Sequence, residues 1–314
     1  MTGPGATAPR NRLAVAGARA TTVAMLRSQP RRDVILNTVF AGMLLLAILI
    51  ALAGLIALLV QAFVKGAPAL STDLFTNPPS TAFPEKAGFR PAIIGSLELI
   101  AGVILFVVPV GIGAAIYLEE YADHSRWWNR AIEVNIQNLA AVPSIVYGIL
   151  GLAFLVRGPL SFGPVVLAGG LTLGLLVLPV VIIAGREAIR AVPPSIREGS
   201  MALGATQWQT IWRQVLPAAV PGIATGVILA LSRAIGETAP LIMVGAATLV
   251  LFDPDLTSRF TALPIQIFDW ISRPSSSVND YAALAAGAIV VLMILLLAMN
   301  AVAIWLRNRF EQKW

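Results

Sequence analysis

Long, uninterrupted apolar stretches constrain this chain more than any other feature. The apolar residues gather into stretches of about 20 or more residues, instead of recurring at the period of an amphipathic helix or strand. Hydrophobic residues make up 57% of the sequence and charged residues 12%, and the mean hydropathy is +0.82. Soluble domains carry roughly 25% charged residues. The sequence therefore predicts an integral membrane protein whose main solvent is lipid.

Six apolar stretches are predicted to be transmembrane helices. They are residues 34–64, 91–118, 134–156, 164–185, 218–251 and 281–306. Each is long enough for a helix to cross roughly 30 Å of hydrocarbon, and none alternates polar and apolar residues as barrel strands do. We therefore expect an all-α polytopic membrane protein. Its expected parts are an N-terminal arm (1–33), a first transmembrane helix (34–64), a core of five transmembrane helices (91–306) and a tail (307–314).

The distribution of basic residues predicts the orientation in the membrane. Residues 1–33 contain six arginines and one acidic residue, Asp33, so the positive-inside rule places the N-terminus in the cytoplasm. The same orientation places the basic loop 186–217 and the tail 307–314 inside, and the net acidic segment 252–280 outside. We predict that both termini are cytoplasmic. The first uncharged stretch is far longer than the 7–15 residues of a signal-peptide core, so we expect a retained helix.

Residue types exclude several kinds of chemistry. There is no cysteine, and the single histidine, His124, lies in a charged loop. A disulfide, a thiolate metal site and a cysteine nucleophile are thereby excluded, and no cofactor or metal is expected in this chain. The net charge of +6 follows the expected membrane topology, so we do not expect nucleic acid as a partner.

The loop 186–217 contains two helix-start signatures in succession. Ser195 with Glu198, and Thr206 with Gln209, have the spacing of a capping box. Gly204 lies between them, where the chain needs a residue that tolerates positive φ. The pattern predicts an elbow made of two short helices.

The elbow carries apolar side chains outside the predicted spans, and Pro217 is expected to begin the next transmembrane helix. Exposed apolar side chains either bind a partner surface or pack on the ends of the chain's own helices, and the sequence leaves both open. These residues are Ile196, Met201, Leu203, Trp208, Ile211 and Trp212.

Two opposite charges lie within the fifth apolar stretch. Arg233 and Glu237 are four residues apart and share one helix face. A charge at this depth costs at least about 2.5 kcal/mol, so it needs a partner or a water-filled cavity. A structural ion pair and a role in a permeation path both remain open. Gly236 and Pro240 should weaken the helix here, and a guanidinium suits a tetrahedral oxyanion. Glu98, inside the second stretch, either belongs to the same path or reaches the interface.

The elbow resembles the cytoplasmic loop of binding-protein-dependent ABC importer permeases. Glu198, Gly204 and Leu216–Pro217 match the family pattern in spacing, whereas Gly199–Ser200 replace two alanines and Gln214 replaces an isoleucine. The resemblance implies the type I importer permease arrangement and a coupling helix that binds a groove of an ATPase subunit. The residues it assigns to that contact are Glu198, Gly199, Ser200, Ala202 and Gly204.

A second resemblance is narrower. The run Arg233–Leu241 closely resembles phosphate-specific (Pst) importer permeases, and Ala239–Leu241 is more like the A subunit than the C subunit of the pair. Val142–Gly148 and Ile94–Leu97 are similar to segments of the same group. In that group the buried Arg and Glu are implicated in phosphate passage. The candidate path residues are Arg233, Glu237, Thr238 and Glu98.

These resemblances imply a permease subunit of an ATP-driven phosphate importer in the bacterial inner membrane. The sequence contains no Gly-x-x-x-x-Gly-Lys-Ser/Thr loop, so ATP and Mg²⁺ would be bound by two separate, B-like ATPase subunits. The other implied partners are a homologous C-like permease subunit and an external, S-like phosphate-binding protein. Sulfate, molybdate or phosphonate as cargo remains an alternative. An ATP-independent transporter, which usually shows an inverted repeat, and an intramembrane enzyme fit the sequence less well.

Overall fold

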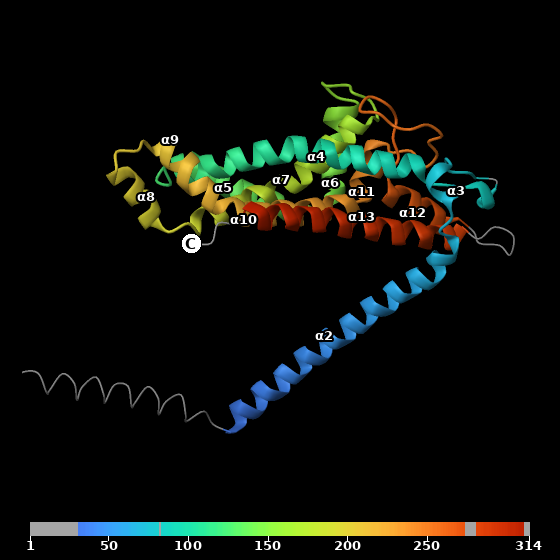
Figure 1. The fold of residues 1–314 in the computed structure, drawn as a ribbon, viewed down its shortest axis with the longest axis horizontal. Coiled ribbons are helices and arrows are strands. Elements are labelled where there is room, and N and C mark those ends of the chain that lie inside the picture. Colours follow the sequence, from blue (N-terminus) through green and yellow to red (C-terminus); the bar gives the residue numbers. More distant parts are fainter. Residues whose placement is uncertain (1–30, 82, 274–280, 311–314) are drawn as a thin grey trace, which may run out of the picture. The chain divides into compact units, whose positions relative to one another are not determined.

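A computed structural model describes residues 31–310 except 82 and 274–280 (Figure 1). The chain divides into two compact units, residues 1–61 and 62–314. Most of the predicted arm and residues 311–314 of the tail lie outside the described residues. The described residues form helices and one isolated β-bridge, between Val165 and Arg259. The prediction of an all-α fold is confirmed.

Helix α2 (Arg31–Gly66) contains the predicted span 34–64 and includes the described residues of the first unit. Apolar side chains lie on all its faces, as expected of a helix that contacts lipid. Asp33 lies in its first turn and Lys65 in its last, where each charge interacts favourably with the helix dipole. The most apolar 18-residue stretch of α2 has a mean hydropathy of 3.2. It is long enough and apolar enough to cross a membrane.

Four long helices run along the axis of the second unit (Figure 1). They are α4 (Arg90–Ile116), α7 (Val166–Arg190), α10 (Leu216–Gly236) and α13 (Tyr281–Phe310). Helix α7 is central, since 67% of its most apolar 18-residue stretch is buried. Small residues let its neighbours approach closely: a Cβ on Gly111 of α4 would lie 2.8 Å from Cγ1 of Val181. The result is a tightly packed core, whose buried members include Val103, Leu173, Val177 and Ala230.

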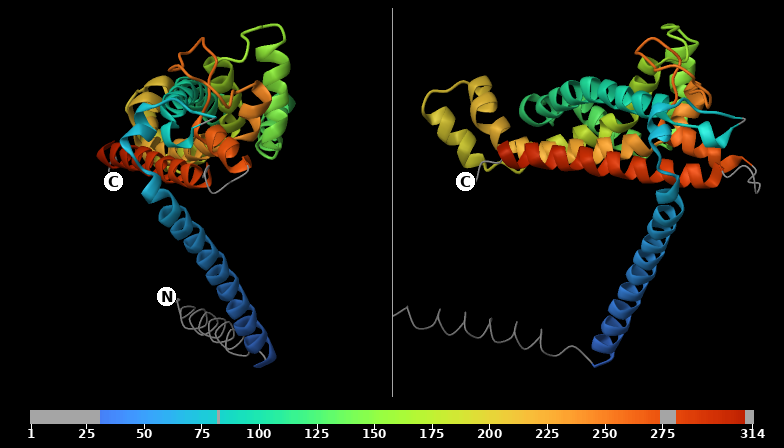
Figure 2. Two further views of the ribbon diagram at one scale, coloured as in Figure 1. Left: turned by 90° about the vertical axis from the view of Figure 1, so that its right-hand side faces the viewer. Right: turned by 45° about the vertical axis from the view of Figure 1, so that its right-hand side comes forward.

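Shorter elements close the two ends of this bundle. At one end lie α8 (Pro194–Ala202) and α9 (Gln207–Thr210), which project beyond the long helices (Figure 2). We call this the elbow end. At the opposite end, the loop end, lie α3 (Thr72–Thr76), α12 (Leu263–Ser272) and the loop 252–262 (Figure 1). The 3₁₀ turns η1 (Ala67–Ala69) and η2 (Pro84–Lys86) flank α3.

The predicted span 134–156 is not one continuous helix. The structure has α5 (Trp127–Ala140), followed by α6 (Ser144–Gly151) and the π-helical turn η4 (Leu152–Val156), with a bend of 105° between the two parts. The cause is Pro143, which has extended ψ and disfavours helical geometry at the residue before it. Within the described residues, five helices are therefore long and apolar enough to cross a membrane, and this bent pair is the sixth candidate.

The predicted span 218–251 also differs at both ends. The helix begins earlier, because α9, the π-helical turn η5 (Ile211–Val215) and α10 form one run over Gln207–Gly236. Pro217 lies in the first turn of α10, as expected, but α10 continues directly from a π-turn, where the normal hydrogen-bond ladder is already altered. The run ends at Gly236, and α11 (Ala239–Val244) follows after a two-residue break. The expected weakness at Gly236 and Pro240 is thus a real interruption.

Candidate functional site

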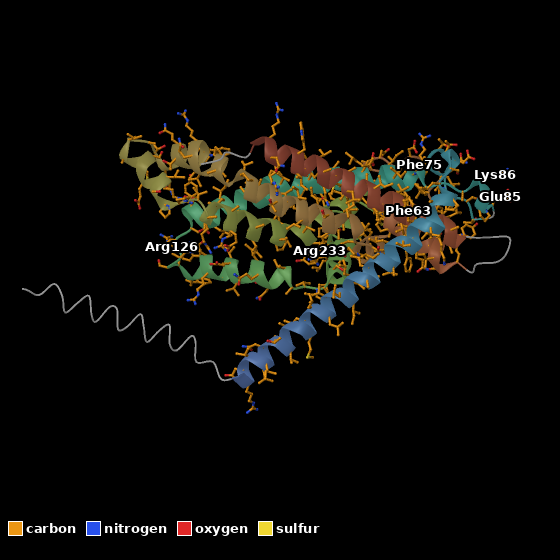
Figure 3. All side chains as sticks on the ribbon, turned by 60° about the horizontal axis from the view of Figure 1, so that its bottom comes forward. Phe63, Phe75, Glu85, Lys86, Arg126 and Arg233 are labelled. Atoms are coloured by element: carbon orange, nitrogen blue, oxygen red, sulfur yellow. The ribbon has the colours of Figure 1, made fainter. Side chains whose placement is uncertain are left out.

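The break between α10 and α11 carries the two predicted charges. Arg233 lies in the last turn of α10, and its Nε donates to Oε1 of Glu237 at 3.2 Å. Arg233 is 47% exposed and Glu237 is 19% exposed, so the pair lies at a surface of this chain rather than in its core. The terminal guanidinium nitrogens make no hydrogen bond to any described residue. They remain available to another anion, and Figure 3 shows Arg233 part-way along the bundle.

Helix α6 packs directly on α11 beside this charge pair. A Cβ on Gly148 would lie 2.7 Å from Cα of Pro240 and 2.7 Å from Cβ of Met243. Only glycine permits so close an approach of the two backbones. The segments Val142–Gly148 and Arg233–Leu241, which are far apart in sequence, therefore meet in space.

Tyr147 is a neighbour of Arg233 that the sequence analysis did not single out. Its side chain is buried, and its hydroxyl donates to the carbonyl of Leu139 at 2.9 Å. The charge of Arg233 acts electrostatically on the same hydroxyl. Tyr147 lies in the segment Val142–Gly148, so the segment was visible in the sequence although its proximity to Arg233 was not. Because the one O–H of Tyr147 already donates to Leu139, the phenol positions the chain near Arg233 and adds no free donor for an oxyanion.

The structure does not join Glu98 to Arg233. Glu98 lies on α4, and its Oε2 is buried without a hydrogen-bond partner among the described residues. Its charged neighbour is Asp255 of the loop end. The backbone N–H and the hydroxyl of Thr257 hold the pKa of Asp255 below its ordinary value, so that this carboxylate stays ionised. The charged group that acts on Glu98 is therefore another acid and not Arg233. Thr238, the fourth predicted path residue, precedes α11, and its side chain does not cap that helix.

The segment Ile94–Leu97 secures the loop end. Ser96 is buried, and its hydroxyl accepts a hydrogen bond from the backbone N–H of Leu263 at 2.9 Å. Gly95 touches the carbonyl oxygen of Thr261, where no Cβ would fit. This segment therefore fixes the start of α12 against α4, and the structure assigns it packing contacts rather than contact with Arg233.

The elbow contains one of its two predicted capping boxes. Thr206 Oγ1 accepts from the N–H of Gln209 at 3.3 Å, and the N–H of Thr206 donates to Oε1 of Gln209 at 3.0 Å. Gly204 has φ +86°, as expected for the residue between the two helices. The first box is wrong: α8 begins at Pro194, and Ser195 makes no capping hydrogen bond. The preset φ of Pro194 starts the helix two residues earlier than expected, because a cap at Ser195 would have made Ile196 the first helical residue.

The apolar side chains of the elbow divide between two roles. Met201, Leu203, Trp208 and Trp212 are exposed, and Leu203 reaches 91%. By contrast, Ile211 is buried, and Ile196 packs on the apolar cluster formed by the ends of α7 and α10. Packing on the chain's own helices is thus confirmed for Ile196 and Ile211, and binding of a partner surface stays a prediction for the four exposed side chains.

The residues assigned to coupling lie on α8 and in the turn that follows it. Glu198, Gly199, Ala202 and Gly204 are exposed, and the Ser200 hydroxyl is hydrogen-bonded to that of Thr210 at 2.9 Å. This bond joins α8 to α9. Because of this bond, α8 and α9 are held together, and we expect them to move together.

Thr206 and Ser195 provide a matched pair for testing the elbow's local structure. We expect Thr206→Ala to destabilise α9 by about 0.5 to 2 kcal/mol, because the reciprocal cap is lost. Ser195→Ala should change stability by less than about 0.5 kcal/mol, because its side chain caps nothing. Hydrogen exchange of the amides of residues 207–210 would measure the difference. Equal exchange in both variants would contradict the assignment of the cap.

Helices of membrane length, a charge pair at a helix break and an exposed apolar elbow are the features expected of a membrane permease. Residues 107–314 match the family described as binding-protein-dependent transport system inner membrane component, and the chain belongs to this family. It is a multi-pass transporter subunit and not an enzyme.

Two relatives share most of the chain. The phosphate transport system permease protein PstA of Haemophilus influenzae is 34% identical over 262 residues, which cover 83% of this chain and 90% of that protein. PstA of Mycobacterium leprae is 34% identical over 288 residues, which cover 90% and 92%. Thus both relatives are matched over nearly their whole length.

A solved structure shows the same fold. A chain from a bacterial alginate ABC transporter, in complex with an alginate pentasaccharide-bound periplasmic protein, aligns with a TM-score of 0.65. The alignment covers 90% of this chain and 98% of that chain at 17% identity. The permease fold predicted from the elbow resemblance is confirmed.

Proposed function

We propose that this chain is a membrane-spanning permease subunit of an ATP-binding-cassette importer that moves inorganic phosphate into the bacterial cytoplasm. The observation that carries this proposal is the free part of the Arg233 guanidinium, which lies at a helix break beside Tyr147. A guanidinium binds a tetrahedral oxyanion through paired hydrogen bonds. The two PstA relatives support phosphate as the cargo.

The charges at the two ends of the bundle support an orientation with the elbow inside. Arg190, Arg197 and Arg307 lie towards the elbow end, whereas Asp253 and Asp255 lie at the loop end. Basic residues favour the cytoplasmic side. In this orientation the elbow faces the ATPase subunits, which bind ATP and Mg²⁺, and the loop end faces an external phosphate-binding protein. The pore is completed by a homologous, C-like permease subunit.

In this mechanism Glu237 competes with phosphate for Arg233. Without cargo, Glu237 neutralises the guanidinium through the 3.2 Å hydrogen bond. Incoming phosphate binds the free nitrogens, and the adjacent carboxylate repels it and so limits how tightly it is held. Closure of the ATPase subunits moves the elbow and re-aims the pore, so that phosphate leaves towards the cytoplasm. Arg233 then releases phosphate and can pair with Glu237 again.

Uptake by the reconstituted complex tests the function. The permease pair, the ATPase subunits and the binding protein are placed in vesicles, and labelled phosphate is followed with and without ATP. We expect uptake only with ATP, and excess sulfate or molybdate should not compete. Preferential uptake of sulfate or molybdate would replace phosphate by another oxyanion. Uptake by this chain alone, without the ATPase, would favour a secondary transporter.

A further inference from the structure

The two helices of the elbow, α8 and α9, each donate hydrogen bonds to the same residue at the end of α4. Glu120 belongs to the π-helical turn η3 (Tyr117–Tyr121), which ends α4. From α8, Arg197 donates two hydrogen bonds to Glu120 Oε1, at 2.7 Å from Nη2 and 3.1 Å from Nε. From α9, Gln207 Nε2 donates to the backbone carbonyl of Glu120 at 2.7 Å. Glu120 therefore connects the elbow to α4 through its side chain and its backbone.

Arg197 also reaches a third helix. It donates to the carbonyl of Val192 at 2.7 Å and to that of Ile189 at 2.9 Å, at the C-terminal end of α7. Carbonyls at a helix end lack intrahelical donors, and a cation there interacts favourably with the helix dipole. The side chains of Arg197 and Glu120 are 21% and 9% exposed, so the pair is shielded from water. One guanidinium thus joins α8, α7 and α4.

Glu119, the residue before Glu120, extends these contacts to α7 and to the bent pair α5 and α6. Glu119 accepts a bidentate pair from Arg190 of α7, with both distances 2.9 Å. Arg186 of α7 is buried between Glu119, at 3.5 Å, and Glu133 of α5, at 2.8 Å. Helix α5 leads through the 105° bend to α6, which packs on α11 beside Arg233. A continuous set of contacts therefore runs from the elbow to the charge pair.

We propose that Arg197 and Glu120 form a transmission joint: two positioning residues that make α4 and α7 follow the displacement of the elbow. This proposal rests on the proposed function. Apolar contacts are non-directional and allow packed helices to slide, whereas a shielded, charge-assisted pair fixes both distance and direction. The elbow is also held by apolar packing of Ile196 and Val215, so it stays folded when the joint is broken. Loss of the joint then separates ATP hydrolysis from transport.

The test measures phosphate transported per ATP hydrolysed in vesicles that contain the full complex. In Arg197→Ala and in Glu120→Ala we expect ATP hydrolysis within about twofold of the wild type and a ratio at least about tenfold lower. The double variant should lose no more than either single variant, because both act through one contact. Arg130→Ala is the control, since Arg130 is exposed on α5 and makes no side-chain hydrogen bond or ion pair to a described residue.

The possible results distinguish failure of the transmission joint from failure of the proposed function. If the variants lower ATP hydrolysis and uptake in proportion to the amount of assembled complex, the pair is only structural and the joint is refuted. Multiplicative losses in the double variant would also refute it. If the wild-type complex takes up no phosphate with ATP, the proposed function itself fails, and the joint fails with it. Wild-type uptake together with a normal ratio in Arg197→Ala would overturn the joint alone.

Discussion

Arg233→Ala is expected to lower phosphate uptake by about two orders of magnitude or more, a loss of the size found in enzymes when one preorganised donor to an oxyanion is removed. The substitution removes the free guanidinium nitrogens at the break between α10 and α11. Assembly with the ATPase should persist, because the elbow lies at the end of the bundle and does not contain this residue. The measurement is labelled-phosphate uptake in vesicles, with complex recovery quantified alongside.

A double variant separates a role in binding from a role as an ion pair. If Arg233 only neutralises Glu237, removing both charges should restore uptake, because breaking a pair costs more than deleting it. If Arg233 binds phosphate, the Arg233→Ala/Glu237→Ala variant should stay inactive. We expect the second result. Arg233→Lys should retain part of the activity, since it keeps the charge but loses the planar pair of donors.

Arg273 supplies a matched control for Arg233. It pairs with Asp269 of α12 at 2.7 Å and with the same four-residue spacing, but at the loop end. Arg273→Ala should therefore leave uptake within about twofold of the wild type. Normal uptake in Arg233→Ala would remove Arg233 from the permeation path.

Local signals in the sequence predicted the local features of the fold. Apolar length indicated the membrane helices, because lipid requires a self-satisfied backbone over a fixed thickness. Thr206 with Gln209 forms the expected cap, and Gly204 has the expected positive φ. The break after Gly236 could also be anticipated, since glycine and a nearby proline weaken a helix wherever they occur. Each of these features depends on residues within one or two turns.

Features that depend on distant residues could not be predicted in the same way. Nothing near Glu120 in the sequence indicates that Arg197 and Gln207 bind it, and nothing near Tyr147 indicates Arg233. A helical pattern shows which face is apolar but not which helix covers it. The bend at Pro143 was missed because the apolar stretch continues across it, and hydropathy does not record backbone geometry.

Gly148→Ala is expected to lower uptake by at least about tenfold, although it adds only one methyl group. That methyl would lie 2.7 Å from Cα of Pro240 and 2.7 Å from Cβ of Met243, so α6 and α11 must move apart. Overpacking of this kind typically costs about 1 to 3 kcal/mol. Helix α11 begins two residues after Glu237, and Tyr147 adjoins Gly148, so the displacement changes how the charge pair faces the tyrosine. Uptake and the thermal stability of the purified complex would both be measured.

Gly113→Ala is the control for the added methyl group. Gly113 lies in α4, where a Cβ would have nothing within 4 Å, and the substitution favours the helix by about 0.5 to 1 kcal/mol. We expect wild-type uptake in this variant. Because misplacement of a binding group by about 1 Å can cost roughly a hundredfold in rate, Gly148→Ala should impair uptake more strongly than its loss of stability alone explains. Normal uptake and stability in Gly148→Ala would mean that α6 and α11 are not in close contact in the working permease.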